Sequence, residues 1–239
     1  MEDRRREYQP STRVRGRMSA AKEAALATLG PRYGIDLAPA AAPGRVEPLD
    51  PPGPTGALGE RLDQAFGRRS DRLVDVGVGN GEATVAWAAT HPARDVVAVE
   101  VHPPSVATTL AAIDAAGSTN VRVVAVDVRA LLAGAAPGDV HDVRLLFPDP
   151  WPKRRHLARR LVDAAFVATV AEVLPTGGTL HVATDWPDYA RQVAAVAAAD
   201  GRFTVEAAAP RPDRPVTTYE AIGLAAGRPI TDVVATRTV

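Results

Sequence analysis

The 239-residue sequence predicts an α/β fold built on a mostly parallel sheet with helices on both faces. Three observations lead to this prediction. From residue 73 onward, short aliphatic runs alternate with stretches of helical periodicity. A glycine-rich turn follows the first run, and an acidic residue ends several of the others. Alternating strands and helices are typical of parallel sheets, whose strands are buried on both faces.

Seven segments have the composition of strands, being rich in β-branched and aliphatic residues. The predicted strands are 73–78, 96–101, 121–126, 143–147, 179–184, 203–209 and 232–238. No helical pattern separates the last two, so we expect an antiparallel pair at one edge of the sheet. Ligands of such sheets bind outside the carboxyl ends of the strands.

The N-terminal part of the chain differs in composition from this alternating region. Residues 1–36 read as a basic arm with a short helix from 19 to 29, for which Ser19 is the expected N-cap. Residues 37–58 are rich in proline and alanine and are predicted to form a linker. The third segment, 59–239, is the predicted catalytic domain.

Composition excludes several classes of protein. Hydrophobic residues make up 46% of the chain and charged residues 23%, as in ordinary globular proteins. Without cysteine, the chain forms no disulfide, zinc–thiolate site or cysteine nucleophile. We find no apolar run of membrane-spanning length and no signal-peptide core, so we expect no membrane partner and a cytoplasmic location. A monomer or a homodimer is expected, with no bound metal.

The first predicted strand runs into a glycine turn, with glycines at positions 77, 79 and 81 and an acid at Asp75. A dinucleotide-binding turn has its third glycine where this chain has Glu82. By itself the turn is equally compatible with a purely structural role. Two further acids, Glu100 and Asp127, end the second and third strands. Each alone is better explained as a helix N-cap or a surface charge, but together with Asp75 they predict a pocket for a positively charged nucleoside such as S-adenosylmethionine.

The sequence FPDPWPKRRH (147–156) follows the fourth strand. Prolines on both sides of Asp149 restrict the backbone and so orient its carboxylate. Trp151 offers a flat face for a purine or for packing. We expect the basic residues from Lys153 to Arg160 to begin a helix. An isolated cationic helix is usually only solvated, but one placed behind an oriented acid favours a nucleic-acid substrate.

Two further segments fall on the same predicted rim. ATDWPDY (183–189) contains Asp185, and RPVTTYE (214–220) contains two threonines, a tyrosine and a glutamate. Each is also compatible with an ordinary loop and an N-cap, which is the default interpretation of the second.

The chain resembles the bacterial tRNA (guanine-N7)-methyltransferases, which are Rossmann-like class I methyltransferases. The resemblance rests on DVGVGNG, VEVHPPSV, FPDPWPKRRHLARRLV, ATDWPDYA and RPVTTYE, and it covers most of the chain from Arg13 onward except the linker. It implies methyl transfer from S-adenosylmethionine to N7 of a guanosine in the tRNA variable loop, at position 46, with tRNA as the partner.

The resemblance also implies roles for individual residues. Asp149 would be the catalytic acid and would contact both cofactor and substrate. The implied cofactor-binding residues are Asp75, Gly77, Gly79, Gly81, Glu100, Asp127 and Asp149. The implied substrate- and RNA-binding residues are Lys153, Arg155, His156, Arg159, Arg160, Asp185, Thr217, Thr218, Tyr219 and Glu220.

The sequence departs from the family pattern at a few positions. Asp75 stands where the family has glutamate, and Thr218 and Tyr219 replace a lysine and a phenylalanine. The segment 221–228 lacks two arginines that the family has there. The change at Asp75 keeps the charge, and the changes in 218–228 bear on the C-terminal RNA contacts. A small-molecule or protein methyltransferase, a non-catalytic RNA-binding protein and a dehydrogenase are the alternative interpretations, in that order.

Overall fold

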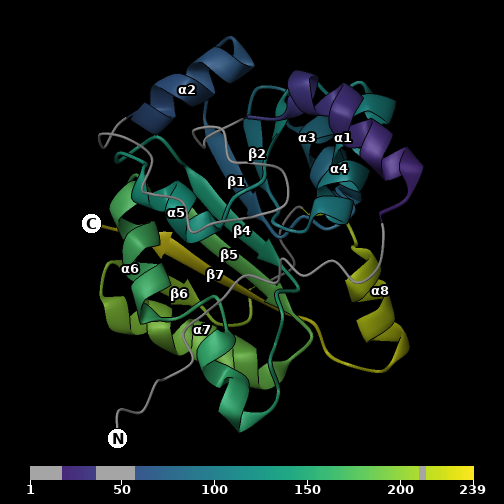
Figure 1. The fold of residues 1–239 in the computed structure, drawn as a ribbon. Helices are drawn as coiled ribbons and strands as arrows, with labels where there is room; N and C mark the ends of the chain where they lie inside the picture. Colours follow the sequence, from purple (N-terminus) through teal and green to yellow (C-terminus); the bar gives the residue numbers. More distant parts are fainter. Residues whose placement is uncertain (1–17, 36–56, 210–213) are drawn as a thin grey trace, which may run out of the picture.

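The computed structural model describes residues 18–35, 57–209 and 214–239. The basic arm up to residue 17 and most of the Pro/Ala-rich linker lie outside the described residues. The described part forms one seven-stranded sheet with the strand order β3-β2-β1-β4-β5-β7-β6 (Figure 1). The predicted fold class is confirmed.

All seven predicted strands are present, with ends that differ by a few residues from the predicted ones. They are β1 (Arg72–Val76), β2 (Asp95–Val99), β3 (Val121–Val124), β4 (Asp142–Leu146), β5 (Thr179–Thr184), β6 (Phe203–Glu206) and β7 (Thr231–Arg237). The first five pair in parallel, whereas β7 lies between β5 and β6 and is antiparallel to both. The expected antiparallel pairing at one edge is therefore present.

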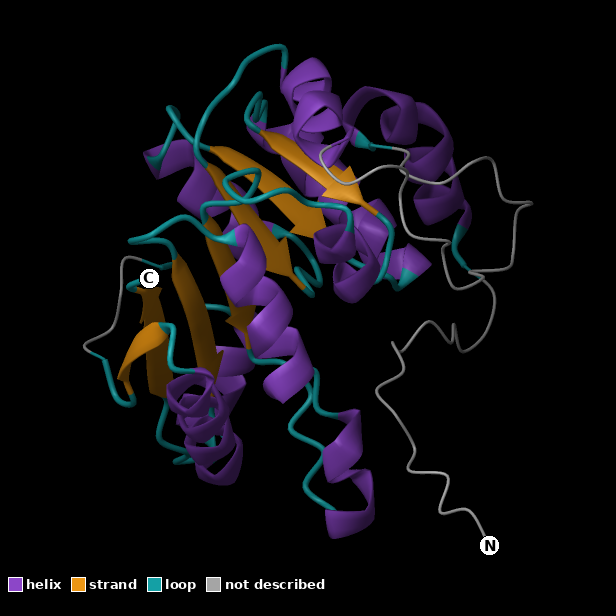
Figure 2. Cartoon of the chain, turned by 90° about the vertical axis from the view of Figure 1, so that its left-hand side faces the viewer, coloured by secondary structure: helices purple, strands orange, loops and turns teal. Residues whose placement is uncertain are grey.

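Helices cover both faces of the sheet (Figure 2). The helices are α1 (Ala20–Tyr33), α2 (Ala57–Phe66), α3 (Glu82–Thr90), α4 (Pro103–Ala116), α5 (Val128–Ala133), the 3-10 helix η1 (Arg154–Arg159), α6 (Ala164–Val173), α7 (Pro187–Asp200) and α8 (Thr218–Ala225). Successive residues of a strand point to opposite faces. Thus Leu73 packs into the core beneath α1, α3 and α4, while Val74 packs into the larger core beneath α2, α5, α6 and α7.

Helix α1 packs on the sheet domain. Ser19 caps it as predicted, accepting a hydrogen bond from the backbone N–H of Lys22. Tyr33 is buried, and its hydroxyl donates to Asp114 of α4 at 2.9 Å. The backbone N–H of Ile35 donates to the carbonyl of Val123 in β3. The predicted division at residue 59 falls inside α2, whose Leu58 is buried in the core.

Two predictions about local structure are wrong. The basic segment does not begin the helix that follows it: η1 ends at Arg159, and α6 starts separately at Ala164, capped by the Asp163 carboxylate. The segment between the last two strands does contain a helix, α8. Its buried residues are Glu220 and Gly223, so it lacks the apolar face that helical periodicity detects.

Candidate active site

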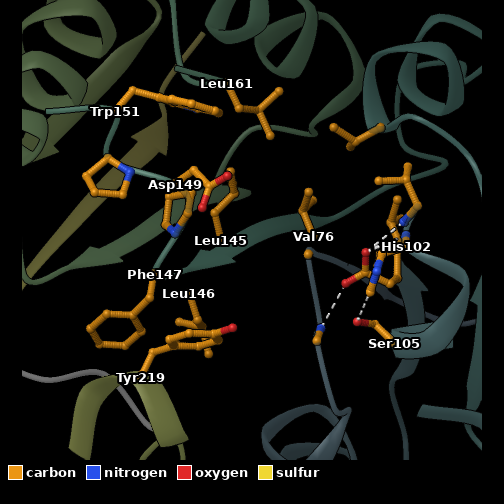
Figure 3. Close-up of a pocket in the computed structure, with 18 of the residues that line it drawn as sticks. Val76, His102, Ser105, Leu145, Leu146, Phe147, Asp149, Trp151, Leu161 and Tyr219 are labelled. Atoms are coloured by element: carbon orange, nitrogen blue, oxygen red, sulfur yellow. Dashed lines mark hydrogen bonds between the residues drawn. The ribbon is translucent and has the colours of Figure 1, made fainter. Parts of the chain in front are cut away.

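A cavity of about 580 Å³ opens at the carboxyl ends of the strands, beside the point where the strand order reverses between β1 and β4. This is the usual ligand position in open α/β sheets. Its walls come from the glycine turn after β1, the end of β2, the loop after β4 and helix α8. In Figure 3, Asp149 and Trp151 lie on one side of the cavity and His102 and Ser105 on the other, with Val76 between them.

The glycine turn adopts a conformation that requires glycine. Gly77, Gly79 and Gly81 all have positive φ angles, between 61° and 77°. A Cβ on Gly81 would also lie 2.8 Å from a side-chain carbon of Thr109 and 3.0 Å from its Cα. Gly77 and Gly79 have open space at the Cβ position, and both line the cavity. The turn therefore packs against α4 at Gly81 and presents backbone to a ligand at the other two positions.

Glu100 is held by backbone donors at the end of β2. One carboxylate oxygen accepts from the N–H groups of Val101 and His102, at 2.8 and 2.9 Å, and the other accepts from Gly79 at 3.0 Å. Glu100 lines the cavity. A carboxylate oxygen accepts about two hydrogen bonds, so the second oxygen keeps capacity for a ligand hydroxyl.

Asp75 does not present a free carboxylate to a ligand. Its oxygens accept two hydrogen bonds from the Arg144 guanidinium, at 3.0 and 2.7 Å, and one from the Thr84 hydroxyl at 2.7 Å. Both members of the ion pair are almost completely buried. Arg144, its register partner on β4, offsets this charge, and the contact of Asp75 with a cationic cofactor stays a prediction.

Asp127 also has a local partner. It is the N-cap of α5, and its carboxylate accepts from the backbone N–H of Arg129 at 2.7 Å. Its neighbours Val126 and Val128 line the cavity instead. The alternative interpretation of this acid, a helix N-cap, thus describes its hydrogen bonding, and its contact with a cofactor stays a prediction.

Asp149 lies in an unusual backbone segment. Phe147 and Trp151, two residues on either side, have φ angles of +56° and +42°, which side-chain-bearing residues rarely adopt. The Asp149 carboxylate lines the cavity. Desolvation by the surrounding protein raises the pKa of Asp149 above its ordinary value. Strained backbone on both sides of a residue and a raised pKa of its carboxyl are characteristic of functional sites.

The basic residues after this loop divide into two groups. Lys153, Arg154 and Arg155 are exposed at the N-cap and start of η1. Arg159 stacks on the Trp151 ring, with its guanidinium carbon 4.9 Å from the ring centroid, and His156 contacts the same ring edge-on. Both Trp151 and Arg159 line the cavity. Trp151 and Arg159 thus form part of the cavity wall, and we call the exposed group, which follows Trp151 closely in the chain, the lip.

Arg160 does not belong to this surface, and the prediction that it contacts RNA is wrong for the conformation described. Its side chain is only 1% exposed. The guanidinium donates to the Pro150 carbonyl at 2.8 Å, to Gln192 at 2.6 Å and to Asp188 at 2.9 Å. It also stacks on Tyr189, 4.7 Å from the ring centroid.

The remaining predicted residues lie on α8 and at the end of β5. Asp185 lines the cavity and accepts from Arg228 at 2.6 Å. Thr217 caps α8 by accepting from the backbone N–H of Glu220. Thr218 and Tyr219 are exposed and line the rim of the cavity or the pocket next to it.

Glu220 is placed differently from the prediction. It is 1% exposed and pairs with Arg214 at 2.6 Å. Arg214 also donates two hydrogen bonds to Asp232 of β7. A carboxylate oxygen of Asp232 lies 2.7 Å from Nε2 of His181. Because its carboxylate is directed into this buried cluster, Glu220 is not positioned to bind a substrate in this conformation.

Sequence reasoning missed several residues of the site. Arg144 gives no signal until the register of β1 and β4 is known. His102 and Ser105, which contact each other at 3.0 Å on the far wall, follow directly after Glu100 in the sequence. Their position at the N-cap and in the first turn of α4 is the available signal. The sequence gives no signal for Arg228 itself, because only the missing arginines of the segment 221–228 stand out there.

Within the described residues, no set of three or more His, Cys, Asp or Glu side chains is arranged to hold a metal ion. In the same part of the chain, no helix has the length and apolar character that a membrane crossing requires.

Comparison with known proteins gives a consistent result. Residues 69–233 match the model of a family described as putative methyltransferases. A tRNA (guanine-N(7)-)-methyltransferase of Alkalilimnicola ehrlichii is 41% identical over 226 residues, which cover 92% of this chain and 89% of the relative. One from Halorhodospira halophila is 38% identical, covering 96% of this chain and 94% of the relative.

The chain belongs to the tRNA (guanine-N(7)-)-methyltransferase family.

Solved structures support the fold of this family member. The crystal structure of the 16S rRNA methyltransferase KamB has a TM-score of 0.55 and 18% identity, covering 75% of this chain and 93% of that one. The antibiotic-resistance methyltransferase Kmr has a TM-score of 0.52 and 20% identity, covering 76% of this chain and 93% of that one. At these identities the likeness concerns the fold alone.

The chemistry of the cavity fits S-adenosylmethionine, the cofactor of this methyltransferase family. Glu100 offers an acceptor for ribose hydroxyls, and the glycine turn offers backbone at close approach. Val101, Val126, Val128 and Leu161 give apolar walls for an adenine ring. Asp149 places a carboxylate in the same cavity, where a positively charged sulfur would be stabilised.

Proposed function

We propose that this chain methylates N7 of a guanosine in the variable loop of tRNA, with S-adenosylmethionine as the methyl donor and 7-methylguanosine as the product. The observation that carries the proposal is the position of Asp149. It shares one cavity with Glu100 and the glycine turn, and the exposed cations of η1 follow it directly. We expect the reaction in the cytoplasm, where tRNA is available.

Guanine N7 is a nucleophile that loses no proton when it is methylated. S-adenosylmethionine supplies an electrophilic methyl group on a positively charged sulfur. Catalysis by the protein therefore depends on orientation and on electrostatics. The N7 lone pair attacks the methyl carbon, and the electrons of the broken carbon–sulfur bond stay on sulfur, so positive charge passes to the purine.

Asp149 contributes to both requirements in this proposal. As a carboxylate it accepts a hydrogen bond from the guanine N1–H or the exocyclic amino group, which fixes the orientation of the base. Its negative charge also stabilises the purine as the purine becomes cationic. Trp151 and Tyr219, which both line the cavity, supply aromatic surface for the base.

The cations of η1 supply affinity in this proposal. Phosphate contacts position a nucleic acid without reading its sequence. The lip formed by Lys153, Arg154 and Arg155 would hold the backbone that flanks the reacting guanosine. A small-molecule methyltransferase has no use for this surface.

The deciding experiment uses the purified protein, methyl-labelled S-adenosylmethionine and unmodified tRNA. We expect one labelled guanosine in the variable loop, located by chemical cleavage at 7-methylguanosine. A matched tRNA with 7-deazaguanosine at that position, which has carbon in place of N7, should accept no label. Label in the 7-deaza substrate would show methylation at another atom, and cofactor binding without label in any tRNA would favour a small-molecule or protein substrate.

A further inference from the structure

We propose that Arg160 is a positioning residue that clamps the backbone next to Asp149, so that it acts on catalysis and not on RNA affinity. The inference rests on the proposed function, because it assigns Asp149 to the reaction. We call residues 151–159 the basic loop; it contains Trp151 and the cations of η1.

Arg160 closes the base of the basic loop. Its Nε atom donates to the carbonyl of Pro150, the residue immediately before the loop, while Arg160 itself is the residue immediately after it. The loop is therefore pinned across its two ends. A movement of the lip would therefore be transmitted through this hydrogen bond to the backbone next to Asp149.

The bonded carbonyl belongs to the peptide plane that joins Pro150 to Trp151. The rotation of this plane sets the φ angle of Trp151, which is +42°. Such an angle is unfavourable in a residue with a side chain and persists only where the surroundings impose it. The Arg160 bond is a contact in the right place to impose it.

Helix α7 holds the clamp from the other side. Arg160 reaches Gln192 and Asp188 through its two terminal nitrogens and lies over the Tyr189 ring. The adjoining backbone is fixed by the same helix, since the N–H of Val162 donates to the Tyr189 hydroxyl at 3.1 Å and its carbonyl accepts from Gln192 at 3.1 Å. Each of the three guanidinium nitrogens thus has an acceptor inside the protein.

Only a guanidinium can make these contacts together. Its planar group donates in several fixed directions, whereas a lysine ammonium is a compact point charge on a flexible chain. Arg160→Lys keeps the charge and most of the volume, and it removes the geometry. This makes it the informative variant, with Arg160→Gln as a second substitution.

We expect Arg160→Lys to lower kcat about tenfold or more, while the KM for tRNA stays within about twofold. The dependence of tRNA affinity on salt should match the wild type, because no phosphate contact is lost. Arg155→Ala, which removes an exposed cation of the same loop, should show the reverse: a weaker salt dependence and a higher KM, with kcat nearly unchanged. Amide hydrogen exchange at Trp151 should increase in the lysine variant only.

The matched control is Arg191→Gln. Arg191 lies on the same helix and contacts the other oxygen of Asp188 at 3.5 Å, but its side chain is 73% exposed. Wild-type kinetics are expected. If the Arg160 variants do not fold, Asp188→Asn tests the clamp through a half-exposed partner, with a loss of a few-fold in kcat and no change in salt dependence.

Wild-type kcat in Arg160→Lys would overturn the proposal, as would a salt dependence reduced to the same extent as in Arg155→Ala. Failure of the proposed function is distinguishable from this outcome. In that case the wild type itself would not methylate tRNA, while the increased exchange at Trp151 in Arg160→Lys would still report the clamp.

Discussion

Asp149 combines an unfavourable environment with an accessible position. Desolvation raises the pKa of its carboxyl, so the folded protein disfavours the charged form that the proposed mechanism uses. The strained residues on both sides add to this cost. Active sites often lower the stability of the folded protein in this way. A substitution at Asp149 should therefore change both activity and stability.

We expect Asp149→Asn to lower kcat by about 10²-fold or more, the scale for losing one preorganised electrostatic group. Stability should respond in the opposite direction. A carboxyl with a raised pKa in the folded state destabilises that state when ionised, so removing the charge should leave the melting temperature at pH 7 unchanged or higher. Activity assays and thermal unfolding of the same variant test both parts. A large drop in melting temperature would show that Asp149 is a structural residue.

The raised pKa also predicts the pH dependence of the wild type. The carboxylate becomes protonated at a higher pH than an ordinary aspartate, so kcat/KM should fall on acidification before the pH reaches about 3.9, the ordinary value. Asp149→Asn should lack this acidic limb in its residual activity. The profile is measured under conditions where the fold is intact by circular dichroism.

The sequence predicts which segments carry the charged residues of the site, but it does not predict the hydrogen-bond partners of most of them. Asp75, Asp127, Glu220 and Arg160 all lie in the predicted segments. The partner of Asp75 is on a neighbouring strand, and those of Arg160 are on α7, so tertiary structure alone reveals them. Glu100 differs, since its donors include the backbone of the next two residues. An interaction that is local in sequence is open to prediction, and one that depends on register is not.

Helix α8 shows the same limit at the scale of an element. Its side chains reverse the usual pattern: Tyr219, Ile222 and Leu224 are more than half exposed, whereas Glu220 is buried. Periodicity searches look for an apolar buried face and find none here. The five parallel strands, by contrast, are largely buried on both faces and so are evident from their composition. The exposed residues Tyr219 and Ile222 line the cavity, which indicates that α8 is shaped for a ligand at its surface.

A buried ion-pair cluster attaches α8 to the sheet. Arg214 binds both Glu220 of α8 and Asp232 of β7, and Asp232 also contacts His181 of β5. Burial alone would raise the pKa of Asp232, but the hydrogen bonds from His181 and Arg214 outweigh it and lower this pKa to about 2. The position of Tyr219 at the cavity thus depends on charges beneath the helix.

We expect the cluster to make the fold sensitive to acid. A carboxyl whose pKa is lowered on folding stabilises the protein above its unfolded pKa, and this contribution is lost as the pH falls from about 4 towards 2. The shift corresponds to roughly 2 kcal/mol at neutral pH. Chemical unfolding of Asp232→Asn should therefore show a loss of at least this size at pH 7 and a smaller loss near pH 3. An equal loss at both pH values would contradict the assignment.

The whole molecule carries a formal net charge of zero, so any attraction to RNA depends on how its charges are distributed. Asp149, Asp185 and Glu100 line the cavity, while the exposed cations of η1 follow at its lip. The fold creates this arrangement because parallel strands direct all their carboxyl ends to one edge. The composition of the strands is sufficient to predict that edge, and with it the location of the site. The hydrogen bonds of several side chains at the site depend on tertiary structure and could not be predicted.

The lip predicts how tRNA binding responds to salt. Each phosphate contact releases counterions, so the slope of log affinity against log salt falls by about 0.7–0.9 when one contact is removed. Alanine at Lys153, Arg154 and Arg155 together should reduce the slope by up to about 2–3, while affinity for S-adenosylmethionine stays at the wild-type level. Arg69→Ala is the matched control, because Arg69 is exposed just before β1, at the opposite edge of the sheet. Filter binding over a range of salt concentrations measures each slope. If the triple variant kept the wild-type slope, or if Arg69→Ala reduced it equally, tRNA would have to bind through a different face of the protein.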